Sequence, residues 1–228
     1  MKKYNIIIII CFLILTFSLS KVYASINGLS LLGKTIYIDP GHGGRDSGAI
    51  FKNIYEKDIN LEISKKLEKE LTSHGAIVYM TRYDDTDLSI GDTNKKRSDL
   101  ANRAYKINKE KPDMYISIHQ NYIESSKWKG LQIFYDSINP KNKGLAEYLT
   151  TSLKDKLMNV RKPKNNNSYY MYSKIQFPGV LIETGFLSNY EDRTNLINEK
   201  YQDKLVKNIT LAIVEYFQSN TWNLFFFI

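Results

Sequence analysis

The chain alternates short β-rich runs with longer amphipathic segments, and this alternation limits its fold more than any other feature. The helical period is clearest in the segment that contains Ile59, Ile63, Leu67 and Leu71, which are spaced four apart. Gly75 follows that segment as a C-terminal cap. Strands that alternate with helices are typical of parallel sheets, because parallel neighbours need a crossover connection. We therefore predict an α/β fold, a single three-layer domain with a largely parallel central sheet flanked by helices.

The expected elements follow one another in the order β-α-β-α-β-β-α-β-α, and a short additional strand is expected just before the last strand. The predicted strands are residues 34–39, 76–82, 114–119, 130–136, 169–172 and 179–184. The predicted helices are residues 56–73, 93–108, 143–158, 191–197 and 200–217. Residues 159–168 are expected to form a solvated loop, with a mobile rim of the substrate cleft as the alternative. The apolar tail, residues 221–228, is expected to pack on the domain, with contact to a partner or a membrane surface as the alternative.

The first 24 residues have the pattern of a secretory signal peptide. Lys2 and Lys3 precede an apolar stretch, residues 6–19, and small residues end with Ala24, where a signal peptidase would cleave. The apolar stretch has about 14 residues, whereas a membrane-spanning helix needs roughly 20. Cleavage after Ala24 is therefore favoured over an uncleaved anchor. We expect residues 1–24 to be a signal peptide, residues 25–228 to form the domain, and the mature protein to be secreted or extracytoplasmic.

Cysteine content and charge narrow the range of functions. The only cysteine, Cys11, lies inside the signal, so the mature chain has neither disulfides nor a cysteine-based zinc site. The net charge is +8, and loss of the three signal lysines leaves +5. A basic exported protein suits an anionic wall polymer, although lysine-rich helix faces that maintain solubility explain the charge equally well. No basic run is interleaved with aromatics, which argues against a nucleic-acid partner.

Four side chains with catalytic or metal-binding chemistry lie at the ends of the predicted elements. His42 follows the first strand, His119 ends the third, and Glu183 ends the last. Glu56 begins the first helix, where a carboxylate also suits the helix dipole. The carboxyl ends of parallel strands gather at one edge of a sheet. All four side chains are therefore expected to face one cleft.

Three of these residues have the chemistry of zinc ligands. Catalytic zinc is bound by three protein nitrogen or oxygen ligands and a water. His42, Glu56 and His119 supply such a set, so we predict one Zn²⁺ per chain, with Glu183 outside the metal shell as the group that moves protons. Each residue also has an ordinary explanation, as a hydrogen-bonded histidine, a first-turn acid or an ion-pair partner. The remaining histidine, His74, lies in the last turn before Gly75 and is expected to be structural.

Four separated motifs occur together in one order: residues 38–44 (IDPGHGG), Glu56, residues 117–121 (SIHQN) and residues 181–189 (LIETGFLSN). These four motifs resemble those of the zinc-dependent N-acetylmuramoyl-L-alanine amidases of the amidase-3 type. The similarity extends over residues 34–217. The resemblance implies that residues 25–228 are a catalytic amidase domain. It implies that His42, Glu56 and His119 bind zinc and that Glu183 is the catalytic glutamate. The substrate it implies is the peptidoglycan amide between the lactyl group of N-acetylmuramic acid and L-alanine.

The layout of a signal followed by one domain resembles the sporulation- and germination-specific branch of that family. This implies action on spore cortex and a role in forming muramic-δ-lactam, in the cell wall or spore cortex space. An activating or regulatory protein partner is left open, and membrane contact is expected only through the signal or the C-terminal tail. The segment between His119 and Glu183 is too short for the helical insertion that blocks the cleft in some regulated members.

Other positions refine this resemblance. Residues 81–82 (TR), Arg97 and Arg103 also match the family, and Arg97 is expected to meet an acid of the substrate or scaffold, or to form a surface ion pair. Residues 120–122 (QNY) replace the small residues that commonly follow the histidine, which predicts a narrower cleft there.

Two rival functions remain compatible with the sequence. A non-catalytic peptidoglycan-binding module would keep the fold and use aromatics such as Tyr169, Tyr170 and Tyr172. The complete ligand set together with Glu183 argues against it. A zinc peptidase that cuts within stem peptides would use the same four residues. Only the products of the reaction separate that activity from amidase activity.

Overall fold

The structure is a computed structural model that describes residues 16, 28–91 and 93–225, with side chains as far as residue 219. The main sheet has the strand order β4-β1-β5-β8-β6-β7. Its strands are β1 (Thr35–Pro40), β4 (Ile77–Met80), β5 (Met114–Asn121), β6 (Gln132–Tyr135), β7 (Lys164–Asn165) and β8 (Gly179–Phe186). The first four strands in the sheet order are parallel, and β6 runs antiparallel to β8. A two-stranded hairpin, β2 (Ile50–Phe51) and β3 (Ile54–Tyr55), stands apart from this sheet.

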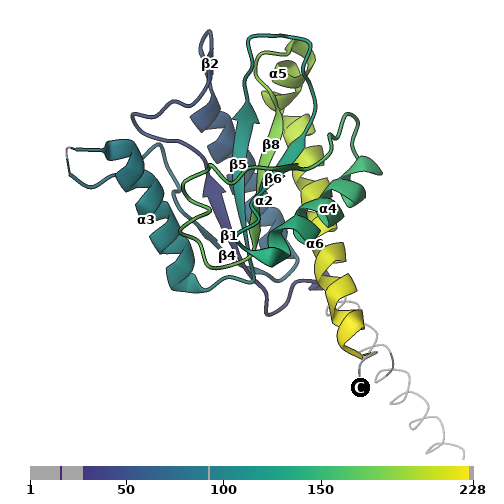
Figure 1. Ribbon diagram of the computed structural model, residues 1–228. Coiled ribbons are helices and arrows are strands. Elements are labelled where there is room, and N and C mark those ends of the chain that lie inside the picture. The colour runs from purple at the N-terminus through teal and green to yellow at the C-terminus, as the bar shows by residue number, and fades with distance from the viewer. Residues whose placement is uncertain (1–15, 17–27, 92, 226–228) are drawn as a thin grey trace, which may run out of the picture.

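Helices cover both faces of the sheet (Figure 1). They are α2 (Glu56–Ser73), α3 (Lys95–Glu110), α4 (Pro140–Lys154), α5 (Tyr190–Leu196) and α6 (Glu199–Phe225). Because side chains alternate along a strand, Ile116 and Ile182 join the larger core with α2, α4 and α6. Tyr115 and Leu181 face the other way, into a smaller core with α3 and the segment 169–177. The predicted three-layer α/β domain with a largely parallel sheet is confirmed.

The first helix is predicted most closely. α2 occupies Glu56–Ser73, with two acids in its first turn and the buried stripe of Ile59, Ile63, Leu67 and Leu71. It ends because Gly75 takes a φ of +88°, a conformation that favours glycine. α4 begins three residues earlier than expected, because the Asn139 side chain caps it and Pro140 starts it, and it ends at Lys154 instead of residue 158.

In the region 159–172 one expectation is wrong and one holds in part. Residues 169–172 do not form a strand, and residues 170–172 are turns. Lys164–Asn165 pair with β6, whereas the rest of residues 159–168 lacks regular secondary structure, as expected of a loop. Tyrosine favours strands, but here Tyr172 is buried in the smaller core and the chain must turn there to cover the sheet.

The two ends of the chain carry the predicted signal and the apolar tail. Apart from Thr16, the predicted signal lies outside the described residues. α6 continues to Phe225, past the predicted end at residue 217, and extends beyond the sheet (Figure 1). The expected packing of residues 221–228 falls outside the described side chains. Within the described part of the chain, no helix has both the length and the apolar character needed to cross a bilayer.

Candidate active site

His42 lies in a tight loop just past the C-terminus of β1. Its φ is +61°, and Gly43 and Gly44 also have positive φ, so the loop turns back sharply. Gly41 packs against the ring of His119, and a Cβ at this position would lie 2.3 Å from that ring. Glycine at position 41 therefore allows the two imidazoles to approach, with ring centroids 4.9 Å apart.

Two buried arginines hold this loop through its backbone carbonyls. Arg103 on α3 donates to the carbonyl oxygens of Pro40 (2.7 Å) and His42 (2.6 Å). Arg82, which follows β4, donates to the carbonyl oxygens of Pro40 and Gly41, both at 3.0 Å. Both guanidinium groups are almost fully buried. They fix the backbone of His42 without occupying the position of a ligand.

Asp39 supplies the counter-charge beneath the loop. Its carboxylate is fully buried and accepts hydrogen bonds from Thr81 (2.7 Å), Ser117 (2.7 Å) and Arg103 (2.8 Å). Burial alone would raise the pKa of Asp39, but Arg103 and the two hydroxyl groups lower it overall. Arg103 also donates to Asp99 at 2.7 Å. This fully paired network joins β1, β5 and α3 directly behind the His42 loop.

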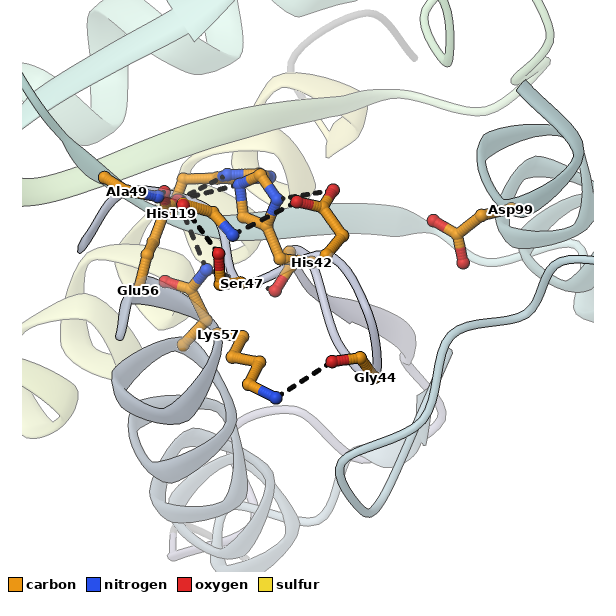
Figure 2. Close-up of polar contacts among 12 residues, drawn as sticks. His42, Gly44, Ser47, Ala49, Glu56, Lys57, Asp99 and His119 are labelled. Atoms are coloured by element: carbon orange, nitrogen blue, oxygen red, sulfur yellow. Dashed lines mark hydrogen bonds and ion pairs between the residues drawn. The ribbon is translucent and has the colours of Figure 1, made fainter. Parts of the chain in front are cut away.

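Glu56 is the first residue of α2, and its carboxylate is the centre of the site (Figure 2). One oxygen, Oε2, accepts from the backbone N–H of Ala49 at 2.8 Å. The other, Oε1, accepts from the backbone N–H of Gln120 at 3.1 Å and lies 3.0 Å from Nδ1 of His119 and 3.1 Å from Nε2 of His42. Burial would raise the pKa of Glu56, but the contacts with the two histidines lower it well below its ordinary value. The carboxylate is therefore ionised.

The arrangement of the three predicted ligands fits a zinc ion. Their ligand-type atoms all lie within 4.8 Å of one another. Ligands in tetrahedral coordination at about 2.0–2.1 Å from zinc lie roughly 3.3 Å apart, close to the separations of 3.0 and 3.1 Å between Glu56 Oε1 and the ring nitrogens. The other ring nitrogen of His119, Nε2, is buried and lacks a hydrogen-bond partner within the described structure. Two imidazoles and a carboxylate are a donor set that suits zinc.

Asp46 orients His42 from the side opposite Glu56. Its Oδ2 lies 2.8 Å from Nδ1 of His42, and its Oδ1 accepts from the backbone N–H of Gly48 at 3.1 Å. A carboxylate in this position fixes the ring and leaves Nε2 to face the cluster. Burial lowers the pKa of His42, but Asp46 and Glu56 outweigh that effect and raise it to about 9. The two carboxylates beside His42 thus favour a positive charge between them.

Glu183 lies on β8 directly beside His119 of β5 in the parallel register. Its Oε2 is buried and has no hydrogen-bond partner among the described residues. Burial, reinforced by repulsion from Glu56, raises the pKa of Glu183 to about 8, although His42 acts in the opposite direction. A cation bound nearby would lower it again. A carboxyl group without a fixed partner is available to exchange protons with a substrate.

A second network behind the site was not expected from the sequence. Asn60 of α2 donates to the carbonyl oxygen of Gly41 at 3.1 Å. Gln120 donates to Asn60 at 3.1 Å and accepts from Thr184 at 2.7 Å. Gln120 is therefore buried and turned away from His119, so of residues 120–122, which predicted a narrower cleft, Gln120 does not contribute to any narrowing. Its position after the histidine was the available signal, but the direction of its side chain follows only from the pleat of β5.

The other residues singled out in the sequence lie elsewhere. His74 is the C-cap of α2, at the far end of the helix from Glu56. Arg97 is exposed on α3 and lies over the ring of Tyr170, 5.1 Å from its centroid; no ion pair of Arg97 is found in the described part of the chain. Tyr169 contacts the site directly, with its ring edge-on to that of His119 at 6.2 Å.

Comparison with known proteins agrees with this geometry. The model of the N-acetylmuramoyl-L-alanine amidase family of the amidase-3 type matches residues 36–215. The chain belongs to this family. The germination-specific N-acetylmuramoyl-L-alanine amidase of Bacillus subtilis (strain 168) is 43% identical over 194 residues, which cover 83% of this chain and 82% of that protein.

Solved structures of similar proteins share the fold. The CwlD amidase from Clostridioides difficile, determined in complex with the GerS lipoprotein, matches with a TM-score of 0.77 at 37% identity, over 82% of this chain and 100% of that chain. The N-acetylmuramoyl-L-alanine amidase from Clostridium difficile 630 matches with a TM-score of 0.72 at 33% identity, over 82% and 97% of the two chains.

Family membership decides between the broad classes of function. The chain is an enzyme, an N-acetylmuramoyl-L-alanine amidase that acts on cell wall peptidoglycan and hence outside the cytoplasm. The non-catalytic binding module is therefore set aside.

Proposed function

We propose that this amidase depends on one zinc ion held by His42, Glu56 and His119, and that Glu183 is its catalytic acid and base. One observation carries the proposal. The β5–β8 register puts Glu183 beside His119, and so beside a cluster whose ligand-type atoms lie within 4.8 Å of one another. The bond cleaved is the amide between N-acetylmuramic acid and L-alanine.

Each residue then has a defined task. When bound, zinc would supply Lewis-acid polarisation of the scissile carbonyl and would acidify a water molecule. Glu183 accepts the proton released as the water oxygen attacks the carbonyl carbon. Glu183 then donates that proton to the alanine nitrogen as the C–N bond breaks. The products are a lactyl carboxylate on the sugar and a stem peptide with a free amino group.

Spore cortex peptidoglycan is the proposed substrate. The support is the 43% identity to a protein whose name describes it as germination-specific. Removal of the stem peptide leaves the lactyl carboxylate that closure of a muramic-δ-lactam ring requires. The protein would reach this compartment through the signal peptide, residues 1–24, with cleavage after Ala24.

A protein partner is also proposed. The support is that the CwlD amidase from Clostridioides difficile, 37% identical to this chain, was determined in complex with the GerS lipoprotein. We infer that this chain likewise binds an exported protein.

Product identification tests the proposed reaction. The purified protein is incubated with defined muropeptides, and the products are analysed by mass spectrometry alongside metal analysis of the enzyme. Release of intact stem peptides with amino-terminal alanine, from protein containing one zinc per chain, is expected. Products cut within the peptide would instead show a zinc peptidase, and activity in metal-free protein would contradict the zinc requirement. Cortex and vegetative murein compared side by side test the substrate preference.

A further inference from the structure

The floor of the active site continues past Glu183 onto the next strand. His119 pairs with Glu183 across β5 and β8, and Glu183 pairs with Gln132 across β8 and β6. Residues directly opposite each other on neighbouring strands point to the same face, with Cβ atoms roughly 5 Å apart. His119, Glu183 and Gln132 therefore form one row, and Gln132 is its outer member.

Gln132 uses both ends of its amide to hold the segment after α4. Its Oε1 accepts from Nε of Arg161 at 3.2 Å, and its Nε2 donates to the carbonyl oxygen of Lys162 at 3.0 Å. The backbone N–H of Arg161 also donates to the carbonyl oxygen of Leu131 at 2.8 Å. The backbone of Arg161 is thus held beside the row of His119, Glu183 and Gln132.

Two aromatic rings fix the Arg161 guanidinium further. It lies 4.7 Å from the ring centroid of Trp128 and 5.6 Å from that of Phe186. Phe186 is buried, and Trp128 is 45% exposed at the rim. The loop that carries Trp128 is itself anchored, because the backbone N–H of Gly130 donates to Asp192 on α5 at 2.8 Å.

The outer edge of this guanidinium is uncommitted. Within the described structure, the hydrogen bond from Nε is the one that the Arg161 side chain donates, and neither Nη atom has a hydrogen bond or ion pair. Arg103 differs, because its Nε, Nη1 and Nη2 all donate to protein acceptors. A planar guanidinium that is held in place, partly exposed and free at both Nη atoms is suited to bidentate binding of a carboxylate.

We propose that Arg161 binds a carboxylate of the stem peptide next to the scissile amide, which rests on the proposed amidase function. In uncleaved substrate the lactyl carboxyl group is part of the amide, and the neighbouring sugars are neutral. A carboxylate close to the cut therefore belongs to the peptide. The nearest is the α-carboxylate of the glutamate after L-alanine, since that glutamate continues the chain through its side chain. Arg161 thus makes the enzyme specific for peptides in which this carboxylate is free and not amidated.

A pair of substrates tests this specificity. Two muropeptides are compared that differ only in the glutamate α-carboxyl group, free in one and amidated in the other. The wild-type protein should show a KM roughly 10- to 100-fold lower for the free acid, the range expected for a charge-assisted hydrogen bond, with similar kcat. In Arg161→Gln this preference should disappear, because KM rises for the free acid alone. Arg161→Lys should retain part of it, since the charge remains without the fork.

A matched control removes a positive charge close to Arg161 in space. Lys129 is next to Trp128 in the chain, and its side chain forms an exposed ion pair with Glu191. The variant Lys129→Gln loses only that ion pair, so it should keep the wild-type preference for the free acid. Equal KM values of the wild-type protein for the two substrates would overturn the inference while leaving the amidase function intact. An equal rise in KM for both substrates in Arg161→Gln would overturn it as well. Failure of the wild-type protein to cleave either muropeptide would instead refute the proposed function.

Discussion

The active site has an arginine on each side of Glu183, and the two arginines are used in opposite ways. We call the side formed by the His42 loop and α3 the His42 wall, and the side formed by β6 and the segment after α4 the opposite wall. On the His42 wall, Arg103 directs every side-chain nitrogen to Asp39, Asp99 and loop carbonyls, and it is buried. On the opposite wall, Arg161 donates one hydrogen bond from Nε and leaves its Nη atoms unbonded within the described structure. Residue type alone therefore does not distinguish an arginine that holds the scaffold from one available to a substrate. The two are distinguished by how many of the guanidinium N–H donors are already bonded to the protein.

A parallel contrast separates the two glutamates. Glu56 is ionised and surrounded by donors, whereas Glu183 has an unpartnered buried oxygen and a pKa raised, chiefly by burial, to about 8. A carboxylate whose lone pairs are already directed suits metal binding, and a partnerless one suits proton transfer. The comparison thus predicts different consequences for substitutions on the two sides.

The largest effect is expected from removal of a ligand. His119→Ala should contain no stoichiometric zinc and should release no stem peptide above background, because two protein ligands hold zinc poorly. Metal analysis of the dialysed protein and product analysis measure the two effects. His74→Ala, the matched control at the far end of α2, should retain both metal and activity. A full zinc content in His119→Ala would remove His119 from the ligand set.

Substitution of Glu183 should separate chemistry from metal binding. Glu183→Gln keeps the size of the side chain, so the protein should fold and keep its zinc while kcat falls roughly 10²- to 10⁴-fold through loss of proton transfer. Steady-state kinetics and metal content are the measurements, with Glu191→Gln on α5 as a control. Unchanged kcat would show that another group moves the proton.

Loss of the buried arginine should act on stability. Arg103→Met leaves Asp39 buried and without its cationic partner, which should lower the free energy of unfolding by about 3–5 kcal/mol. Arg97→Met, on the exposed side of the same helix, should change it by less than about 0.5 kcal/mol. Urea denaturation of the two variants measures the difference. Equal stabilities would mean that the Asp39 network does not support the His42 wall.

The smallest effect is expected from the group that orients His42. Asp46→Asn keeps a hydrogen-bonding side chain but loses the carboxylate, and zinc affinity should fall roughly 10- to 100-fold. Competition with a chelator measures the affinity. Asp203→Asn on the exposed face of α6 is the control and should bind zinc as the wild-type protein does. Equal affinity in Asp46→Asn would show that the His42 loop orients the imidazole unaided.

The sequence pattern was sufficient to predict the bounds of elements whose start and stop signals lie within the element itself or next to it. The bounds of α2 follow from a four-residue apolar period, acids in the first turn and Gly75 at the end, all within one stretch of chain. It failed for residues 169–172, where tyrosines suggested a strand. There the tertiary requirement to cover the smaller core outweighs the strand preference of the side chains.

The positions of His42, His119 and Glu183 were open to prediction because each lies near the carboxyl end of a recognisable strand of a parallel sheet. Their roles as ligands and base remain predictions for the experiments above. The supporting contacts had no comparable signal. Arg103 is 64 positions from Asp39, and Arg161 is 29 positions from Gln132, so nothing in the sequence near either residue indicates its partner.

The sequence by itself determined the order of the helices and of the longer strands, and the edge of the sheet at which the reactive side chains gather, because periodicity and strand ends are properties of neighbouring residues. Only the tertiary structure decided which carboxylates and guanidinium groups are fully bonded and which are left for substrate. That outcome depends on the register between β5, β8 and β6 and on the packing of α3, where distant parts of the chain exclude water and compete for the same donors.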